Sequence, residues 1–95
     1  MAHFEIQFTD GFSGQSMRMC RDSDVICETV LQTQFQTGLA HVEQIDADDE
    51  SEIRICVEGA DEAAITLKAD RPFMVISLRG DELRIDKVAD RPGYA

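Results

Sequence analysis

The stretch 53–68, IRICVEGADEAAITLK, contains two short segments of alternating apolar and polar residues separated by a turn. In the first segment Ile53, Ile55 and Val57 occupy every second position, which is typical of a half-buried β-strand. The four residues that follow include a glycine among polar and small residues, and the alternation then resumes over 63–68. This stretch therefore predicts two β-strands joined by a turn.

The same alternation, bounded by turn-forming residues, recurs along the chain at spacings of about ten residues. It predicts further strands at 3–9, 16–20, 39–45, 73–78 and 83–86. The run 73–78 is apolar on both faces, so we expect it to be the most buried strand. No crossover helix is evident in the second half of the chain. The pattern predicts an all-β fold, a small antiparallel β-sandwich or barrel of seven or eight short strands.

The stretch 25–37 is compatible with two structures. A helix at about 24–36, capped by Ser23 or Asp24, would give an alternative α+β fold of β-grasp-like type. However, six of the thirteen residues are β-branched, and such residues lose rotamer freedom in a helix and pack well on a sheet. The composition therefore favours a strand.

Length and charge limit both the architecture and the possible partners. The 95 residues fit a single domain over 1–95, with 89–95 as an extended C-terminal tail. A hydrophobic fraction of 43% is too high for intrinsic disorder. The formal net charge of −10 disfavours nucleic acid as a partner because the chain would repel phosphate backbones.

No membrane association or export is expected from the sequence. No apolar run approaches the roughly 20 residues needed to cross a bilayer, and the N-terminus lacks the features of a secretory signal. Three cysteines are also a poor disulfide framework. These observations predict a cytoplasmic protein.

An acidic loop is the sharpest polar cluster in the sequence. Asp46, Asp48, Asp49 and Glu50 are candidate ligands for calcium, which prefers several carboxylate and carbonyl oxygens. The loop lacks the glycine and the distal glutamate of an EF-hand, so a solvated connection between strands is the competing interpretation. We expect no cofactor, and calcium bound by this loop is the alternative.

The thiols and imidazoles offer a second set of potential ligands. Cys20, Cys27 and Cys56 with His3 and His41 contain the chemistry of a zinc site but lack paired Cys-x-x-Cys spacing, so free thiols that act as small hydrophobes are expected. A catalytic cysteine would need a nearby histidine, and Cys27 with His41 is the candidate pair. The high negative charge opposes thiolate formation there.

No motif indicates an enzyme: the chain lacks a nucleophile elbow, a phosphate-binding loop and a dinucleotide fingerprint. We therefore predict a small acidic, non-enzymatic protein-interaction or assembly module. Its partner would be another protein or, more simply, a second copy, because the doubly apolar strand 73–78 would need cover. Tyr94 and Arg91 in the tail are candidate contact residues.

Two alternative functions follow from the acidic residues. The first is an acidic inhibitor or immunity-type protein that neutralises a basic partner by electrostatic attraction. The second is a divalent-ion-binding domain. Acidic residues gathered on one face, such as 46–52 with Glu58 and Asp61, would favour the inhibitor.

Overall fold

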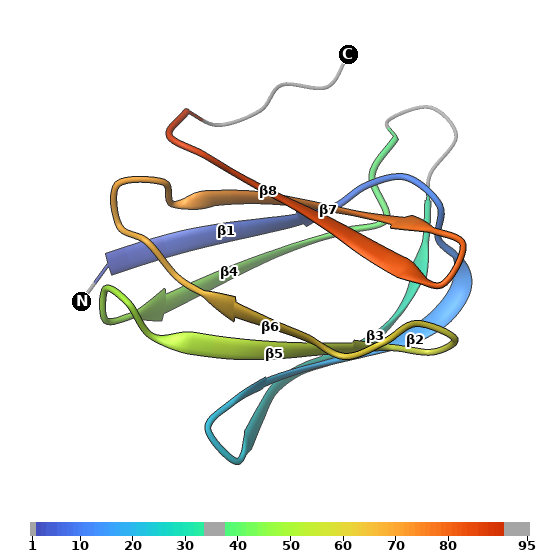
Figure 1. Ribbon diagram of the computed structural model, residues 1–95, viewed down its shortest axis with the longest axis horizontal. Helices are drawn as coiled ribbons and strands as arrows, with labels where there is room; N and C mark the ends of the chain where they lie inside the picture. The colour runs from blue at the N-terminus through green and yellow to red at the C-terminus, as the bar shows by residue number, and fades with distance from the viewer. Residues whose placement is uncertain (1, 34–37, 91–95) are drawn as a thin grey trace.

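A computed structural model describes residues 2–33 and 38–90 and contains eight β-strands in two four-stranded sheets (Figure 1). The described residues contain no helix and hence none that could span a membrane, and the sheets do not close into a barrel. The all-β prediction is therefore confirmed. The strands are β1 (Ala2–Phe8), β2 (Ser13–Arg21), β3 (Asp24–Gln32), β4 (His41–Ala47), β5 (Glu52–Val57), β6 (Ala63–Thr66), β7 (Phe73–Arg79) and β8 (Glu82–Val88).

The two sheets differ in how their strands pair. Sheet A has the order β4-β1-β7-β8, and sheet B has the order β3-β2-β5-β6. Sheet B is antiparallel throughout, as predicted, whereas β1 and β7 of sheet A run parallel and make that sheet mixed. The parallel pair is possible because the two strands are far apart in the sequence, and the chain between them crosses to sheet B and returns twice.

The core lies between the sheets and is formed by the inward-facing side chains of both. Alternate residues along the strands point inward, as the period of two requires. Phe8 and Phe12 meet edge to face in this core, with ring centroids 5.9 Å apart. The buried apolar residues are Phe4, Ile6, Phe8, Phe12, Met17, Met19, Leu31, Ala47, Ile53, Ile55, Val57, Ile65, Leu67, Met74, Ile76 and Leu78.

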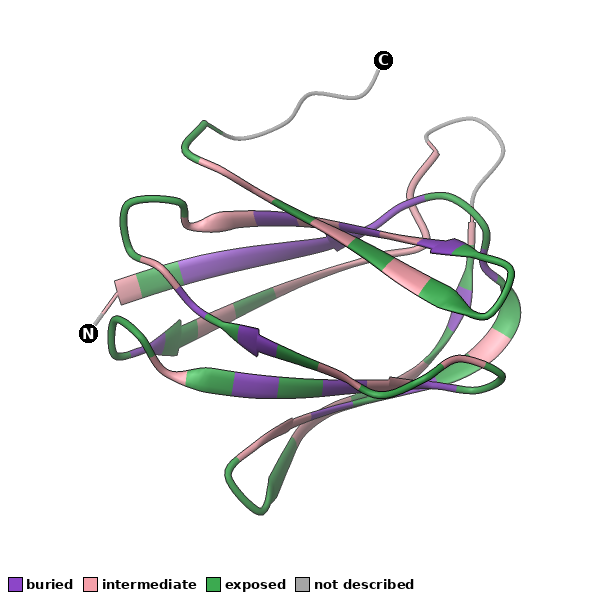
Figure 2. Cartoon of the chain, in the orientation of Figure 1, coloured by how far each residue is buried: buried purple, intermediate pink, exposed green. Residues whose placement is uncertain are grey.

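The most buried strand is β1, so the prediction that 73–78 would be most buried is wrong. Five consecutive residues of β1 are buried, including Glu5 at 3% and Gln7 at 2% exposure (Figure 2). In β7 only alternate residues are buried, and Phe73 and Val75 on its other face are half-buried. Apolar composition predicted the wrong strand because neighbouring elements, and not the strand's own residues, determine how much of its outer face is covered.

The ambiguous stretch 25–37 forms a strand up to Gln32, so the β-branched residues indicated the right structure. Residues 34–37 of that stretch lie outside the described residues. The predicted tail 89–95 is described only as far as Asp90, and its candidate contact residues Arg91 and Tyr94 therefore also lie outside the described part.

The turn between β1 and β2 packs against the end of β7 at Gly11. The Leu78 amide donates to the Asp10 carbonyl at 2.9 Å, which places this turn against the end of β7. Gly11 has a φ of +92°, and a Cβ at this position would collide with the Leu78 carbonyl oxygen. Glycine is therefore required here both for the backbone conformation and for the close approach.

Candidate functional site

The edge strands β3 and β4 follow one another in the chain and lie at the same side of the molecule. β3 is the last strand of sheet B and β4 is the last strand of sheet A, so the chain crosses from one sheet to the other between them. Their inward faces look toward each other across the open edge of the sandwich. This junction brings together side chains from both sheets.

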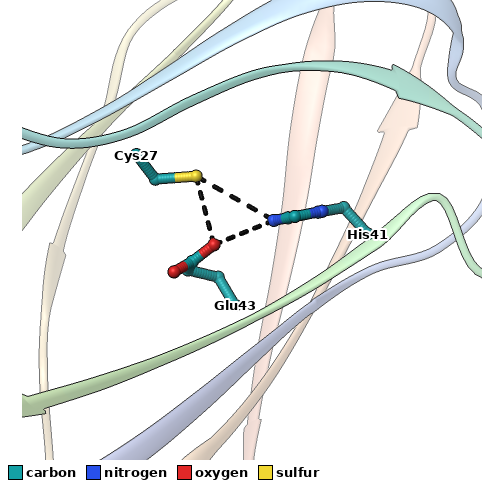
Figure 3. A group of neighbouring side chains, drawn as sticks. All are labelled: Cys27, His41 and Glu43. Atoms are coloured by element: carbon teal, nitrogen blue, oxygen red, sulfur yellow. Dashed lines mark hydrogen bonds and ion pairs between the residues drawn. The ribbon is translucent and has the colours of Figure 1, made fainter.

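Three chemically different side chains meet at this junction (Figure 3). Cys27 lies opposite Met19, which is a core residue, so its thiol points inward. On β4, His41 lies opposite Phe8 and Glu43 lies opposite Ile6, so both also face inward. The alternation of β-structure therefore gives His41 and Glu43 the same face, two residues apart.

The three side chains form a closed triangle of polar contacts. The Cys27 Sγ donates to Glu43 Oε1 at 3.2 Å, His41 Nε2 lies 2.9 Å from the same oxygen, and Sγ and Nε2 are 3.9 Å apart. The His41 ring also packs against Phe8, with centroids 6.2 Å apart, which restricts its orientation. The His41 and Glu43 side chains are 29% and 26% exposed, so the cluster is accessible from solvent.

The electrostatics of the cluster keep the thiol protonated. Burial, followed by the hydrogen bond to Glu43 and its negative charge, raises the pKa of Cys27 to about 11. A nucleophilic cysteine needs a lowered pKa, so this setting is the opposite of a catalytic cysteine site. What the arrangement offers instead is one sulfur, one nitrogen and one oxygen atom directed at a common point.

The other two cysteines lie on the outer face of sheet B. In the register of this sheet Cys20 is opposite Arg54 and Cys56 is opposite Arg18, so the two thiols are diagonal neighbours. Burial, followed by Glu62 and Cys20, raises the pKa of Cys56, while Arg18 and Arg54 oppose the shift. Cys27 is on the opposite face, so the structure does not bring the three thiols together.

The four acidic residues predicted as a loop have separate partners: Asp46 is on β4, and the other three lie between β4 and β5. Asp46 pairs with His3 at 2.9 Å, and Asp49 accepts from the backbone amide of Ala69 at 2.8 Å. Glu50 accepts from Lys68 at 2.8 Å, a hydrogen bond that raises the pKa of Lys68. For Asp48 the contact is made by its backbone, whose carbonyl accepts from Ser51. A calcium site in this loop stays a prediction.

The outward side of β3 is a second unusual feature of the same strand. The large hydrophobic residues that are exposed in the described part of the chain are Val25 at 51% and Val30 at 60%, and both are on β3. A shallow hollow of about 310 Å³ adjoins this strand on the outer face of sheet B. It is lined by Ser16, Met17, Arg18, Glu28, Cys56, Val57 and Glu58.

Reasoning from the sequence named the pairing of Cys27 with His41, and the structure places them in contact. It missed Glu43, which was one carboxylate among many. The signal was available in part: His41 and Glu43 at alternate positions of a strand must share a face. That this face is the inner one, and that Cys27 lies across from it, depends on how the sheets pack.

Comparison of the chain with models of protein families, with curated proteins and with solved structures finds no match.

Proposed function

We propose that this protein is a non-enzymatic assembly module that forms a homodimer by pairing strand β3 with the β3 of a second copy. The observation that carries the proposal is the location of Val25 and Val30, two large exposed hydrophobic residues on one edge strand. Sheet edges carry unpaired backbone donors and acceptors, and an edge that also exposes apolar side chains is a site for strand addition.

A comparison of β3 with two of the other edge strands, β6 and β8, supports the choice of β3. β6 has only four residues, and β8 carries four charged side chains along its seven residues. Short length and frequent charges are the usual means by which proteins block pairing at an edge. β3 has nine residues with no proline and no lysine, and its charged residues are Asp24 and Glu28. Glu28 is paired with Arg18 of the same sheet, which reduces its effect.

A second copy of the chain is the simplest partner for this edge, because its own β3 strand has the complementary backbone donors and acceptors. Two β3 strands related by a twofold axis run antiparallel, so each supplies the donors and acceptors that the other lacks. The dimer would join two copies of sheet B into one continuous eight-stranded sheet and cover the valines. Because each copy carries a net charge of −10, repulsion opposes the pairing, and added salt should strengthen it.

The placement of the acidic residues gives less support to an inhibitor of a basic protein. The loop 46–50 precedes β5, whereas Glu58 and Asp61 follow it, so these acidic groups lie at opposite ends of one strand. A dispersed arrangement of this kind is suited to solubility, and it does not concentrate the field on a single docking face.

The experiment is size-exclusion chromatography with light scattering across a concentration series of about 10–500 µM. We expect a concentration-dependent dimer whose fraction rises between about 50 and 500 mM NaCl. Val30→Lys should give a monomer, because a lysine on the edge prevents close strand pairing. Ala64→Lys, an exposed position on edge strand β6, is the matched control and should leave the dimer intact. A wild-type monomer over the whole series, or a Val30→Lys variant that still dimerises, would overturn the proposal.

A further inference from the structure

We infer that Cys27, His41 and Glu43 form a binding site for a single zinc ion that bridges β3 of sheet B and β4 of sheet A. This site does not depend on the proposed dimer, because the three side chains face the interior of one copy. Their potential ligand atoms all lie within 4.8 Å of one another, the one such group of three or more found in the described part of the chain.

The chemistry of the ligands selects the metal. A thiolate and an imidazole are poor ligands for calcium and magnesium but good ligands for zinc, and a carboxylate completes a mixed set that zinc accepts. A zinc site with three protein ligands keeps its fourth position for water or another external ligand. Partial exposure of His41 and Glu43 leaves room for that fourth ligand.

The geometry is close to that of a tetrahedral site. Zinc bonds of about 2.3 Å to sulfur and about 2.0–2.2 Å to nitrogen and oxygen place ligand atoms about 3.4–3.6 Å apart. The three separations are 3.9 Å from Sγ to Nε2, 3.2 Å from Sγ to Oε1 and 2.9 Å from Nε2 to Oε1. Each lies within about 0.5 Å of the tetrahedral value. Small side-chain movements, with no change in the strands, are therefore enough to admit the ion.

The charge balance also suits a half-buried position. On binding, the Sγ–H bond of Cys27 breaks, a Zn–S bond forms and the proton leaves to solvent. The thiolate and the Glu43 carboxylate together carry two negative charges, which neutralise the dication while His41 binds as neutral imidazole. A neutral complex avoids the cost of an uncompensated charge at the edge of the core.

The test is titration of metal-free protein with Zn²⁺ by isothermal calorimetry, in excess Mg²⁺ to occupy sites made of oxygen atoms alone. A parallel titration with Co²⁺ reports the thiolate by its charge-transfer absorption. We expect one zinc ion per chain, a thiolate–cobalt band, and a rise in Tm on adding one equivalent of Zn²⁺.

The variants distinguish this cluster from the other thiols, imidazoles and acids of the chain. Cys27→Ser should abolish the cobalt band. Cys27→Ser and His41→Gln should each weaken zinc binding by at least the roughly 10–100-fold that loss of an outer-shell partner costs. Cys56→Ser and His3→Gln are the matched controls and should bind like the wild type. Circular dichroism shows whether each variant folds. If one of the other variants fails to fold, Glu43→Gln still tests the carboxylate ligand, because it keeps the shape of the side chain. Absence of zinc binding by the folded wild type, or unchanged binding by folded Cys27→Ser, would overturn the inference.

Discussion

Strands β1 and β3 show opposite relations between residue type and burial. β1 buries a glutamate and a glutamine on the face that points away from the core, whereas β3 leaves two valines more than half exposed. The difference lies in position: β1 has hydrogen-bonded neighbours on both sides, β4 and β7, and β3 has a neighbour on one side only. A strand's place in its sheet can therefore outweigh its own hydrophobicity in determining which side chains are covered.

The buried glutamate of β1 is held by hydrogen bonds from side-chain amides. Glu5 accepts from the Gln7 amide at 2.8 Å and from the Gln44 amide at 3.2 Å. Burial of a carboxylate is tolerated only where such partners exist. The valines of β3 need no hydrogen-bond partners, because their side chains have no polar group. Single apolar side chains exposed at the surface are common in folded proteins.

The largest expected effect comes from truncating the inward face of β1. Phe8→Ala should lower the free energy of unfolding by about 3–5 kcal/mol, because it leaves a cavity beside Phe12 and His41. Urea unfolding followed by circular dichroism measures this. Val30→Ala on β3 is the comparison and should change stability by less than about 0.5 kcal/mol in dilute protein. Equal losses for the two variants would show that the edge strand is as well packed as the central one.

A smaller effect is expected from the outer face of β1. Glu5→Ala removes the acceptor of two amides, so we expect a loss of about 1–3 kcal/mol. The control is Glu28→Ala on β3, which breaks an exposed ion pair with Arg18 and should cost no more than about 1 kcal/mol. If Glu5→Ala unfolds at the same urea concentration as Glu28→Ala, the hydrogen bonds of Glu5 add no more to stability than the exposed ion pair does.

The smallest effect is expected at the exposed valine itself. Val30→Thr keeps the β-branched shape and should alter the unfolding free energy of dilute protein by less than about 0.5 kcal/mol. The same change at Val57, which is buried on β5, places a hydroxyl in the core and should cost about 1–3 kcal/mol. A large loss at Val30 in dilute protein would mean that this edge is covered within a single copy.

Much of the fold was predictable because strand signals are local. Alternation over 53–57 and 63–67, and the β-branched composition of 25–32, depend only on neighbours along the chain. The parallel pairing of β1 with β7 was not predictable in this way, because it joins segments almost 70 residues apart. The prediction that 73–78 is the most buried strand was wrong for the same reason, because burial also depends on contacts between segments distant in the sequence.

In the candidate sites, too, some features followed from residue type and others depended on how the strands pack. Residue type was enough to mark the cysteines and histidines as potential metal ligands, and Cys27 with His41 was named only as a candidate catalytic pair. Adding Glu43 required knowing that β4 presents it inward and that β3 lies opposite. The acidic loop was conspicuous in the sequence, yet in the structure Asp46, Asp49 and Glu50 each bond to a different group.

The sequence by itself determined that this chain is acidic and all-β and where most of its strands lie. Side-chain alternation and turn chemistry are encoded over a few residues, and net charge needs no structure at all. Only the tertiary structure decided which strands became central and which became edges. It thereby decided that Glu5 is buried, that Val30 is exposed, and that a cysteine from one sheet meets a histidine and a glutamate from the other. Those outcomes depend on contacts between distant segments, which form only when the two sheets pack together.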